Sequence, residues 1–395
     1  MSRSVGCHRS LPVALGLKAL SAVLLVAAMC FALTVRASDA EFDNVARVVA
    51  VGDLHGDYEQ YLAILQQNGL IDERLKWSGG ETHFVQLGDV TDRGPDSLKI
   101  IRHLQKLEKQ ARKKGGRVHV LIGNHEAMNI QTDLRYVHPG EYQALVTSQS
   151  DKLRERYLDA VFQAVVNQSP TPVSKPEQEK ARLKALYPLG YVEHRQLWEP
   201  GRELARWYAK QNTVIRINDS LYLHGGLNPH AASYPSLEAI NRTISRELES
   251  GEKNGLSTQP DGPLWYRGLA VHDASEELEP LQAMLEFYGA EHIVIGHTPT
   301  GGAILPRFDR RVIRADVGIS SWYNQALANV LQEDGELYAM HRGEQFVLPD
   351  DKGVDAYVGS VLELEAADSR MVRCINKRKE AVETLEAAAG FACKW

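Results

Sequence analysis

The stretch Val51-Gly52-Asp53-Leu54-His55-Gly56-Asp57 decides the fold of this chain. It follows an apolar run, residues 46–51, that predicts a buried strand, and it precedes an amphipathic run, 58–67, that predicts a helix. Its two glycines allow a sharp turn at the end of the strand. Such a turn places Asp53 and His55 together at the carboxyl edge of a sheet, where open α/β sheets bind their ligands. A carboxylate and an imidazole two residues apart can bind one metal ion.

The same junction of a strand with a polar turn recurs at four further places. Each of four predicted strands runs into a glycine-bounded loop, and these strands are 82–87, 117–122, 220–223 and 291–295. All five loops together carry the polar side chains Asp53, His55, Asp89, Asp92, Arg93, Asn124, His125, His224 and His297. Helices predicted between the strands indicate a layered α/β core with helices on the sheet faces. Because the loops occupy equivalent positions, we expect them to form one site.

The residue types in these loops are those of a site for two metal ions. Carboxylate, imidazole and amide ligands suit Mn²⁺, Zn²⁺ or iron better than Ca²⁺. Two ions require a shared carboxylate, because only an anion holds two like charges so close together. Two metals about 3.5–4 Å apart bind the attacking and leaving oxygens of an in-line displacement, and a water between them becomes hydroxide near neutral pH. The pattern therefore predicts hydrolysis without a covalent intermediate.

Residues 1–37 have the pattern of a secretory signal peptide. A basic start precedes a run without charge from residue 19 to 35, and Val35-Arg36-Ala37 offers small residues for cleavage. An uncleaved membrane anchor and an ordinary buried helix are the alternatives. After cleavage two cysteines would remain, Cys374 and Cys393, either as a disulfide or as free thiols. We therefore expect a periplasmic or secreted protein.

The chain has 395 residues, 44% of them hydrophobic, which is enough for one large core or two smaller ones. Its net charge is −6 and no basic block stands out, so no nucleic-acid partner is expected. We predict a main domain over 41–346 and a C-terminal tail over 347–395. The segments near 303–307, 312–315, 326–332 and 336–340 are expected to form a β-meander that closes the main domain. Within the main domain, the helical interval 127–210 predicts a cap inserted over the site, and an excursion on the far side is the alternative. His138 and His194 in this interval are candidates for substrate contact.

The loop motifs, in their order along the chain, resemble those of the calcineurin-like metallophosphoesterases and, within them, the phosphoprotein phosphatase family. These motifs are Gly-Asp-x-His-Gly, Gly-Asp-x-x-Asp-Arg-Gly, Gly-Asn-His-Glu, His-Gly-Gly and Gly-His-Thr, and the resemblance covers residues 45–340. The stretch 123–130, with Asp133-Leu134-Arg135-Tyr136 behind it, is similar to the Shewanella-like branch of that family, as is Leu264-Trp265-Tyr266-Arg267-Gly268. The resemblance implies a layered β-sandwich flanked by helices, with the helical cap as an insertion.

The resemblance also implies a role for each matching residue. Asp89 would be shared between the two ions, and the implied metal ligands are Asp53, His55, Asp89, Asn124, His224 and His297. His125 would be the general acid, Asp92 would orient it, and Arg93 would bind the phosphoryl oxygens. The implied reaction is the hydrolysis of a phosphomonoester by a hydroxide that bridges two divalent ions. We expect Mn²⁺, with iron and Zn²⁺ as the alternatives.

Two departures from the family pattern concern phosphate binding. Eukaryotic serine/threonine phosphatases of the family carry an arginine before Gly-Asn-His-Glu, where this chain has Ile122, and no equivalent of their later tyrosine-bearing loop is recognised. Arg267 is therefore our candidate for a second phosphate-binding residue, and a surface arginine stacked on Trp265 is the alternative. Trp322 and Tyr323 either line the pocket or pack in the core.

The expected function is that of a metal-dependent phosphomonoesterase. Its substrate would be a phosphorylated protein, phosphotyrosine among the targets, or a small phosphomonoester. One alternative is a hydrolase of dinucleoside polyphosphates or small nucleotides. Another, from a different class, is a non-catalytic envelope protein that keeps a metal ion, although the complete ligand set and the Asp92–His125 pair argue against it. Contact with a membrane is expected only through an uncleaved N-terminal anchor.

Overall fold

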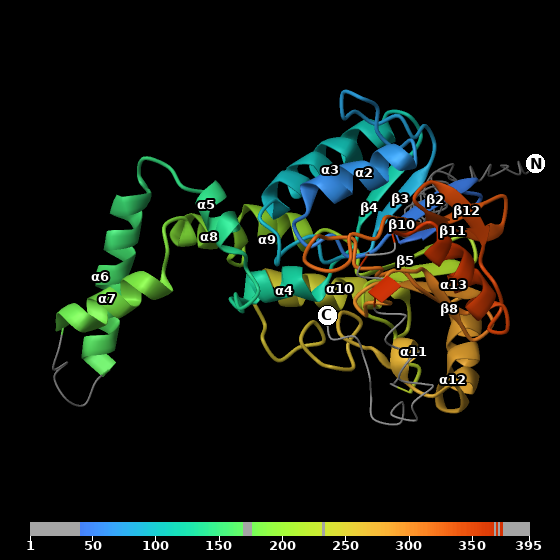
Figure 1. The fold of residues 1–395 in the computed structure, drawn as a ribbon. Helices are drawn as coiled ribbons and strands as arrows, with labels where there is room; N and C mark the ends of the chain where they lie inside the picture. Colours follow the sequence, from blue (N-terminus) through green and yellow to red (C-terminus); the bar gives the residue numbers. More distant parts are fainter. Residues whose placement is uncertain (1–39, 169–175, 231–233, 367–368, 370–371, 374–395) are drawn as a thin grey trace, which may run out of the picture.

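Two six-stranded mixed sheets form the centre of the protein, and helices cover their outer faces (Figure 1). The computed structural model describes residues 40–168, 176–230, 234–366, 369 and 372–373. The predicted signal peptide and the two cysteines, Cys374 and Cys393, lie outside these residues. Within the described ranges, no helix combines the length and the apolar character that crossing a bilayer requires.

The first sheet contains the strand that precedes Asp53 and His55. Its strand order is β12 (Glu344–Val347), β11 (Glu336–His341), β10 (Ala328–Glu333), β2 (Arg47–Val51), β3 (His83–Gln86) and β4 (Arg117–Val120). The last three strands are parallel, and two helices connect them, α2 (Tyr58–Gln67) and α3 (Ser97–Arg112). Parallel neighbours require such crossover connections. All three strands therefore end at the same edge of the sheet.

The second sheet is formed by the C-terminal half of the chain together with one short N-terminal strand. Its strand order is β1 (Glu41–Phe42), β5 (Val214–Ile217), β6 (Ser220–Leu223), β7 (His292–Ile295), β9 (Val312–Arg314) and β8 (Leu305–Arg307). The two sheets are joined through their polar side chains as well as their apolar ones. The buried hydroxyl of Tyr222 on β6 donates a hydrogen bond of 3.1 Å to Gln332 on β10. This arrangement confirms the predicted layered α/β fold with a sandwich of two sheets.

The predicted closing β-meander is wrong in one respect. The segments near 303–307, 312–315, 326–332 and 336–340 do form strands, but β8 and β9 belong to one sheet, whereas β10 and β11 belong to the other. β9 pairs in parallel with β7, and β10 pairs antiparallel with β2. The loop between β9 and β10 therefore crosses from one sheet to the other, and it passes the carboxyl end of β2. The later elements β12 and α13 (Val354–Glu363) were not predicted.

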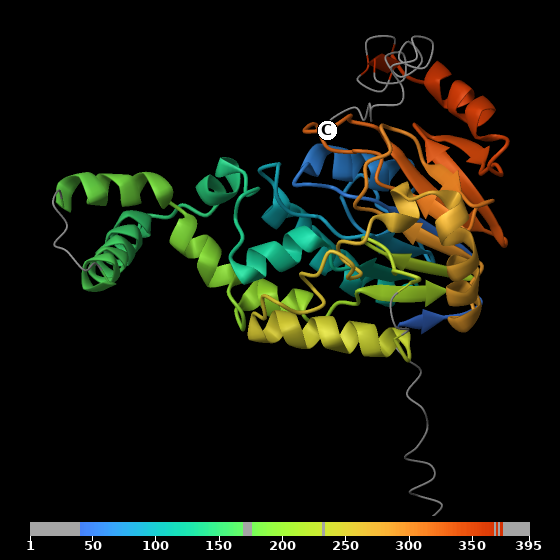
Figure 2. The same cartoon turned by 90° about the horizontal axis from the view of Figure 1, so that it is seen from below.

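The interval 127–210 is helical, as predicted, but its helices have two different positions. The interval begins within α4 (Asn124–Gln131). The helices that follow are α5 (Pro139–Ala144), α6 (Ser150–Gln168), α7 (Pro176–Leu186), α8 (Tyr191–Trp198) and α9 (Glu203–Tyr208). The inner helices α5, α8 and α9 lie against the sandwich, whereas α6 and α7 form a hairpin that extends away from it (Figures 1 and 2). Among the described residues of this hairpin, only Ser150, Leu158 and Leu183 are buried. The hairpin therefore does not cover the ends of the strands.

Three further helices pack on the second sheet, and they are α10 (Leu237–Ser250), α11 (Gly268–Val271) and α12 (Ala274–Phe287). The ends of α10 show common capping residues. The side chain of Ser236 accepts a hydrogen bond from the backbone N–H of Ala239 and so caps α10. Gly251, with φ of 70°, ends the helix in the left-handed conformation that glycine adopts without strain.

Candidate active site

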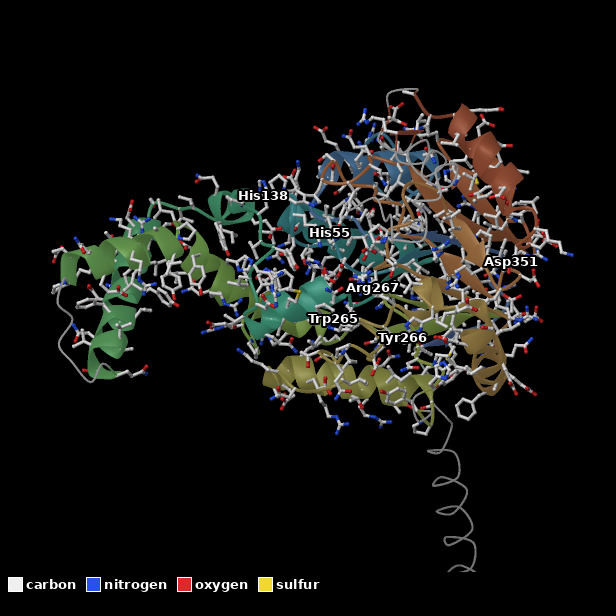
Figure 3. The ribbon with its side chains drawn as sticks, turned by 60° about the horizontal axis from the view of Figure 1, so that its bottom comes forward. His55, His138, Trp265, Tyr266, Arg267 and Asp351 are labelled. Atoms are coloured by element: carbon white, nitrogen blue, oxygen red, sulfur yellow. The ribbon has the colours of Figure 1, made fainter. Side chains whose placement is uncertain are left out.

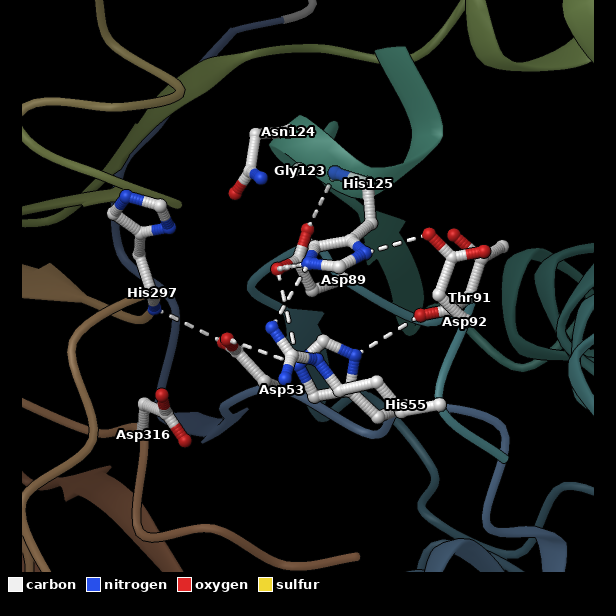
Figure 4. A network of polar contacts seen from close by, with 12 residues as sticks. Asp53, His55, Asp89, Thr91, Asp92, Gly123, Asn124, His125, His297 and Asp316 are labelled. Atoms are coloured by element: carbon white, nitrogen blue, oxygen red, sulfur yellow. Dashed lines mark hydrogen bonds and ion pairs between the residues drawn. The ribbon is translucent and has the colours of Figure 1, made fainter. Parts of the chain in front are cut away.

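The loops that follow β2, β3 and β4 of one sheet and β6 and β7 of the other converge on one point (Figures 3 and 4). All nine polar side chains predicted from the sequence belong to this cluster. Asp53 follows β2 and accepts a hydrogen bond of 3.1 Å from the backbone N–H of His297, which follows β7. The two halves of the chain therefore meet directly at the site.

The backbone of the site is held in an unusual conformation. Five non-glycine residues have left-handed φ angles: His55 (44°), Asp89 (53°), Asp92 (70°), Arg93 (64°) and His297 (65°). Each such residue costs about 1–3 kcal/mol and persists only where its surroundings impose it. Here the carbonyl of Asp89 accepts hydrogen bonds of 3.0 Å from the backbone N–H groups of both Leu54 and His55. The loops of His55 and Asp89 are therefore joined to each other through their backbones.

Glu126 fixes the loop of Asp89, a role that the sequence analysis did not assign. Its fully buried carboxylate accepts hydrogen bonds from the backbone N–H groups of Asp89 (3.0 Å), Val90 (2.9 Å), Thr91 (3.2 Å) and Gly123 (2.8 Å). Gly123 is required at its position, because a Cβ atom there would lie 2.2 Å from the carboxylate of Asp89. The motif Gly-Asn-His-Glu therefore contributes in two ways. Glu126 orders the Asp89 loop, and Gly123, which has no side chain, leaves room for the Asp89 carboxylate.

Asp89 lies at the centre of the predicted metal ligands. Its carboxylate oxygen is 3.3 Å from Nε2 of His224, 3.8 Å from Nε2 of His125 and 3.9 Å from Nε2 of His55. Asp53 lies 3.9 Å from His55 on one side and 3.8 Å from His224 on the other. Two groups of residues that share Asp89 could each hold one ion. One group is His55, Asp89 and His125, and the other is Asp89, His224 and His297. Within each group the ligand atoms, one from each residue, all lie within 4.8 Å of one another.

The charges at this point favour a divalent cation. Burial, followed by the charges of Asp316 and Asp89, raises the pKa of Asp53 well above its usual range. Burial also raises the pKa of Asp316 to about 6. Burial lowers the pKa of His55 to about 3, with His125 as the second cause, which leaves the neutral imidazole that binds metals. Three buried carboxylates beside the neutral imidazole of His55 fit a pair of divalent ions, whose charge would offset the repulsion among the carboxylates.

His125 is held by a short hydrogen bond and keeps one ring nitrogen available. Its Nδ1 lies 2.6 Å from Oδ2 of Asp92, so Nε2 points toward Asp89 and toward Nη2 of Arg93, at 3.8 and 3.5 Å (Figure 4). Burial opposes the charged ring, but the carboxylates of Asp89 and Asp92 outweigh it and raise the pKa of His125 above its usual value. A protonated imidazole at this place can donate to an oxygen that arrives beside the metal ligands.

Two further side chains, neither of them predicted, hold Asp92 in place. The amide of Asn129 donates a hydrogen bond of 2.9 Å to Oδ1 of Asp92. Glu141, on the inner cap helix α5, accepts a hydrogen bond of 3.2 Å from the backbone N–H of Asp92 and another from the hydroxyl of Ser97. The carboxylate that orients His125 is thus fixed from α4 (Asn124–Gln131) and from the cap.

The two predicted phosphate-binding arginines occupy different positions. Arg93 is half-buried beside His125, and among the described residues its Nε atom has no hydrogen-bond partner. Arg267 is exposed and donates to the carbonyl of His297 (2.7 Å) and to Oγ1 of Thr298 (3.0 Å). Trp265 accepts a hydrogen bond of 3.1 Å from Nε2 of His297 through its carbonyl. The loop of Arg267 and Trp265, both labelled in Figure 3, therefore borders His297, a predicted metal ligand.

Three aromatic residues considered in the sequence analysis have clear positions. His194 is only 1% exposed and lies against Trp198 and Tyr142, so it cannot contact a substrate. His138 accepts a hydrogen bond from the backbone N–H of Gly140 at the start of α5. Tyr323 does reach the site, where its ring lies 5.5 Å from that of His55. The loop between β9 and β10 thus supplies a tyrosine that comparison of the motifs did not reveal.

A model of the family described as calcineurin-like phosphoesterase matches residues 46–301, which include all five loops of the site. The chain belongs to the calcineurin-like phosphoesterase family. The fold and the family predicted from the motifs are thereby confirmed. The enzyme class follows from this membership: the chain is a phosphoester hydrolase with divalent metal ions.

Within the calcineurin-like phosphoesterases, the chain is similar to proteins of the predicted Shewanella-like branch. It is 31% identical to Shewanella-like protein phosphatase 2 of Arabidopsis thaliana, over 74% of this chain and 76% of the relative. It is 28% identical to Shewanella-like protein phosphatase 1 of Plasmodium berghei, over 74% of each chain. The crystal structure of a cold-active protein-tyrosine phosphatase of a Shewanella species superposes with a TM-score of 0.59 and 27% identity, over 78% of this chain and 82% of that one.

Proposed function

We propose that this enzyme is a metal-dependent protein phosphatase that hydrolyses phosphotyrosine side chains in the periplasm or outside the cell. The observation that carries the proposal is the His125–Asp92 pair, which lies beside the shared carboxylate Asp89 and beside Arg93. The similarity to proteins named as protein phosphatases, one of them a protein-tyrosine phosphatase, supports the choice of substrate. The predicted signal peptide, residues 1–37, supports the location in the periplasm or outside the cell.

The ligand set divides naturally into two metal positions that share Asp89. We propose that Asp53 and His55 hold one ion and that Asn124, His224 and His297 hold the other. Bound divalent ions, which we propose to be Mn²⁺, supply Lewis acidity and make a water nucleophilic at neutral pH. The hydrogen bond of 2.9 Å between Nε2 of His224 and the side-chain oxygen of Asn124 supports their grouping at one position.

The other side chains of the site would act on the phosphate and on the leaving group. Arg93 has a donor free for the phosphoryl oxygens, because among the described residues its Nε atom has no hydrogen-bond partner. The protonated Nε2 of His125 would donate its proton to the leaving oxygen, while Asp92 keeps the ring oriented through Nδ1. Arg267, at the rim, would bind an oxygen that points away from Arg93.

A substrate panel tests the proposal directly. The full chain, loaded with Mn²⁺, is assayed with a phosphotyrosine peptide, a phosphoserine peptide of the same sequence and a dinucleoside polyphosphate, and phosphate release is measured. We expect the phosphotyrosine peptide to be hydrolysed with the highest kcat/KM. Arg93→Ala should raise KM, whereas Arg242→Ala, an exposed arginine on α10, should not. Efficient turnover of the dinucleotide alone would contradict the protein phosphatase assignment.

A further inference from the structure

The guanidinium group of Arg93 contacts two tyrosine rings. Its central carbon is 4.9 Å from the centre of the Tyr136 ring and 5.2 Å from that of the Tyr323 ring. The backbone N–H of Arg93 also donates a hydrogen bond of 3.0 Å to the carbonyl of Tyr136. Cation–π contacts with two rings restrict the rotation of the guanidinium plane. Its Nη2 atom lies 3.5 Å from Nε2 of His125, which places N–H donors of Arg93 beside the predicted metal ligands.

The two rings differ in their access to solvent. Tyr323 is 7% exposed and lies over His55, whereas Tyr136 is 41% exposed, although it is a large aromatic residue. The exposed ring belongs to the wall beside the general acid, because its centre lies 5.1 Å from the centre of the His125 ring. Arg135 also lies over the Tyr136 ring, at 5.8 Å from its centre, and the ring stays partly open to solvent. Tyr136 is thus a partly exposed aromatic side chain that adjoins both Arg93 and His125.

The position of the leaving group follows from these contacts. A leaving oxygen must come within hydrogen-bond reach of Nε2 of His125, while the phosphoryl oxygens contact Arg93. The group attached to that oxygen must then pass the ring of Tyr136, since this ring adjoins both of those side chains. An aromatic leaving group can form a ring–ring contact with the exposed part of Tyr136, and an aliphatic one cannot. Stacked or edge-to-face aromatic pairs add stabilisation beyond the burial of apolar area.

We propose that Tyr136 is a specificity-determining residue, whose exposed ring stacks on the phenyl ring of the substrate and thereby favours aryl over alkyl phosphomonoesters. This inference rests on the proposed function, since it concerns the leaving group of the same reaction. The energy of one aromatic pair predicts a preference of roughly 2- to 10-fold. Tyr323, whose ring centre lies 5.2 Å from the guanidinium carbon of Arg93, contributes to the arginine's orientation only.

The binding of two phosphonates tests the inference. Phosphotyrosine and phosphoserine differ in the reactivity of their leaving groups, whereas phosphonates are not hydrolysed, so only their affinities are compared. Phenylphosphonate and methylphosphonate share the phosphoryl group and differ in the ring. Their dissociation constants are measured by calorimetry on the Mn²⁺-loaded full chain, for the parent, Tyr136→Phe, Tyr136→Leu and Tyr323→Leu. We expect the preference for phenylphosphonate to persist in Tyr136→Phe and to fall by roughly 2- to 10-fold in Tyr136→Leu. In Tyr323→Leu both ligands should weaken by the same factor.

An equal loss of affinity for both phosphonates in Tyr136→Leu would overturn the inference, because the ring would then act only by packing on Arg93. Unfolding curves followed by circular dichroism establish that each variant is folded. The ratio of kcat/KM for the two peptides should change in parallel with the phosphonate ratio. A parent protein that hydrolyses neither peptide would refute the proposed function. Calorimetry needs no turnover, so the ratio of the two phosphonate affinities would still decide the role of Tyr136.

Discussion

We expect the replacement of Glu141 by glutamine to stabilise the protein at alkaline pH and to leave its stability nearly unchanged at acid pH. Glu141 is 6% exposed, and its carboxyl group accepts hydrogen bonds from the backbone N–H of Asp92 and the hydroxyl of Ser97. Burial, with the charge of Asp92 as the second cause, raises the pKa of Glu141 from 4.5 to about 8. The group is therefore largely protonated in the folded protein at neutral pH.

The sign of the effect follows from the difference between the folded and unfolded states. Because the folded-state pKa of Glu141 lies above the unfolded-state value of 4.5, its contribution to stability is fully present below pH 4.5 and is lost as the pH rises through about 8. The full difference corresponds to roughly 5 kcal/mol, and local relaxation with entry of water reduces it. Glutamine has no such proton to lose and keeps an oxygen for the two donors. We therefore expect an advantage of about 2 kcal/mol near pH 8.5.

Urea unfolding of the metal-free chain, followed by circular dichroism near pH 5 and near pH 8.5, measures this difference. The free energy of unfolding of Glu141→Gln minus that of the parent should rise between the two pH values. Glu249→Gln, on the exposed face of α10, is the matched control for the same chemical change at the surface. A difference that is the same at both pH values would refute the assignment of a protonated carboxyl group at Glu141.

Four substitutions within the site have distinct expected outcomes. Asp89→Asn should lose bound Mn²⁺ and activity together, as metal analysis after dialysis and a phosphatase assay would show; retention of both ions would contradict its shared position. His125→Asn should keep the metal and lose about 10²- to 10⁴-fold in kcat, so full activity on a poor leaving group would exclude the acid role. Glu126→Gln should weaken metal affinity, because the order of the Asp89 loop depends on the carboxylate, and calorimetry with Mn²⁺ measures this. Arg267→Ala should raise the inhibition constant of inorganic phosphate, and unchanged inhibition would remove this residue from the phosphate site.

The sequence predicted the residues that meet at the site because each of them is local to a recognisable junction. A strand, a glycine and a polar side chain lie within a few positions of each other, as at Gly52-Asp53 and Gly88-Asp89. Parallel strands connected by helices must then end at one edge of the sheet. The strand-end position of each ligand was therefore available from periodicity and turn chemistry alone.

The supporting side chains were not predictable in the same way. Asn129 and Glu141 contact Asp92 from positions 37 and 49 residues away, and Asp316 meets Asp53 from the other sheet. No local pattern marks such contacts, because a buried carboxylate within a helix resembles any exposed acidic residue until its neighbours are known. The same limit explains the error over the closing meander: alternation along β8 to β11 indicates strands but does not indicate which sheet they join.

The backbone link between the loops of His55 and Asp89 has a consequence for the exchange of metal ions. The hydrogen bonds from Leu54 and His55 to the carbonyl of Asp89 involve no ligand atom, so they hold the two loops together whether or not an ion is bound. Release of an ion then requires no local unfolding, and a different ion can enter the same rigid arrangement of ligands. The metal carried by the enzyme would accordingly be set by the supply of divalent ions around the folded protein, and it would change when that supply changes.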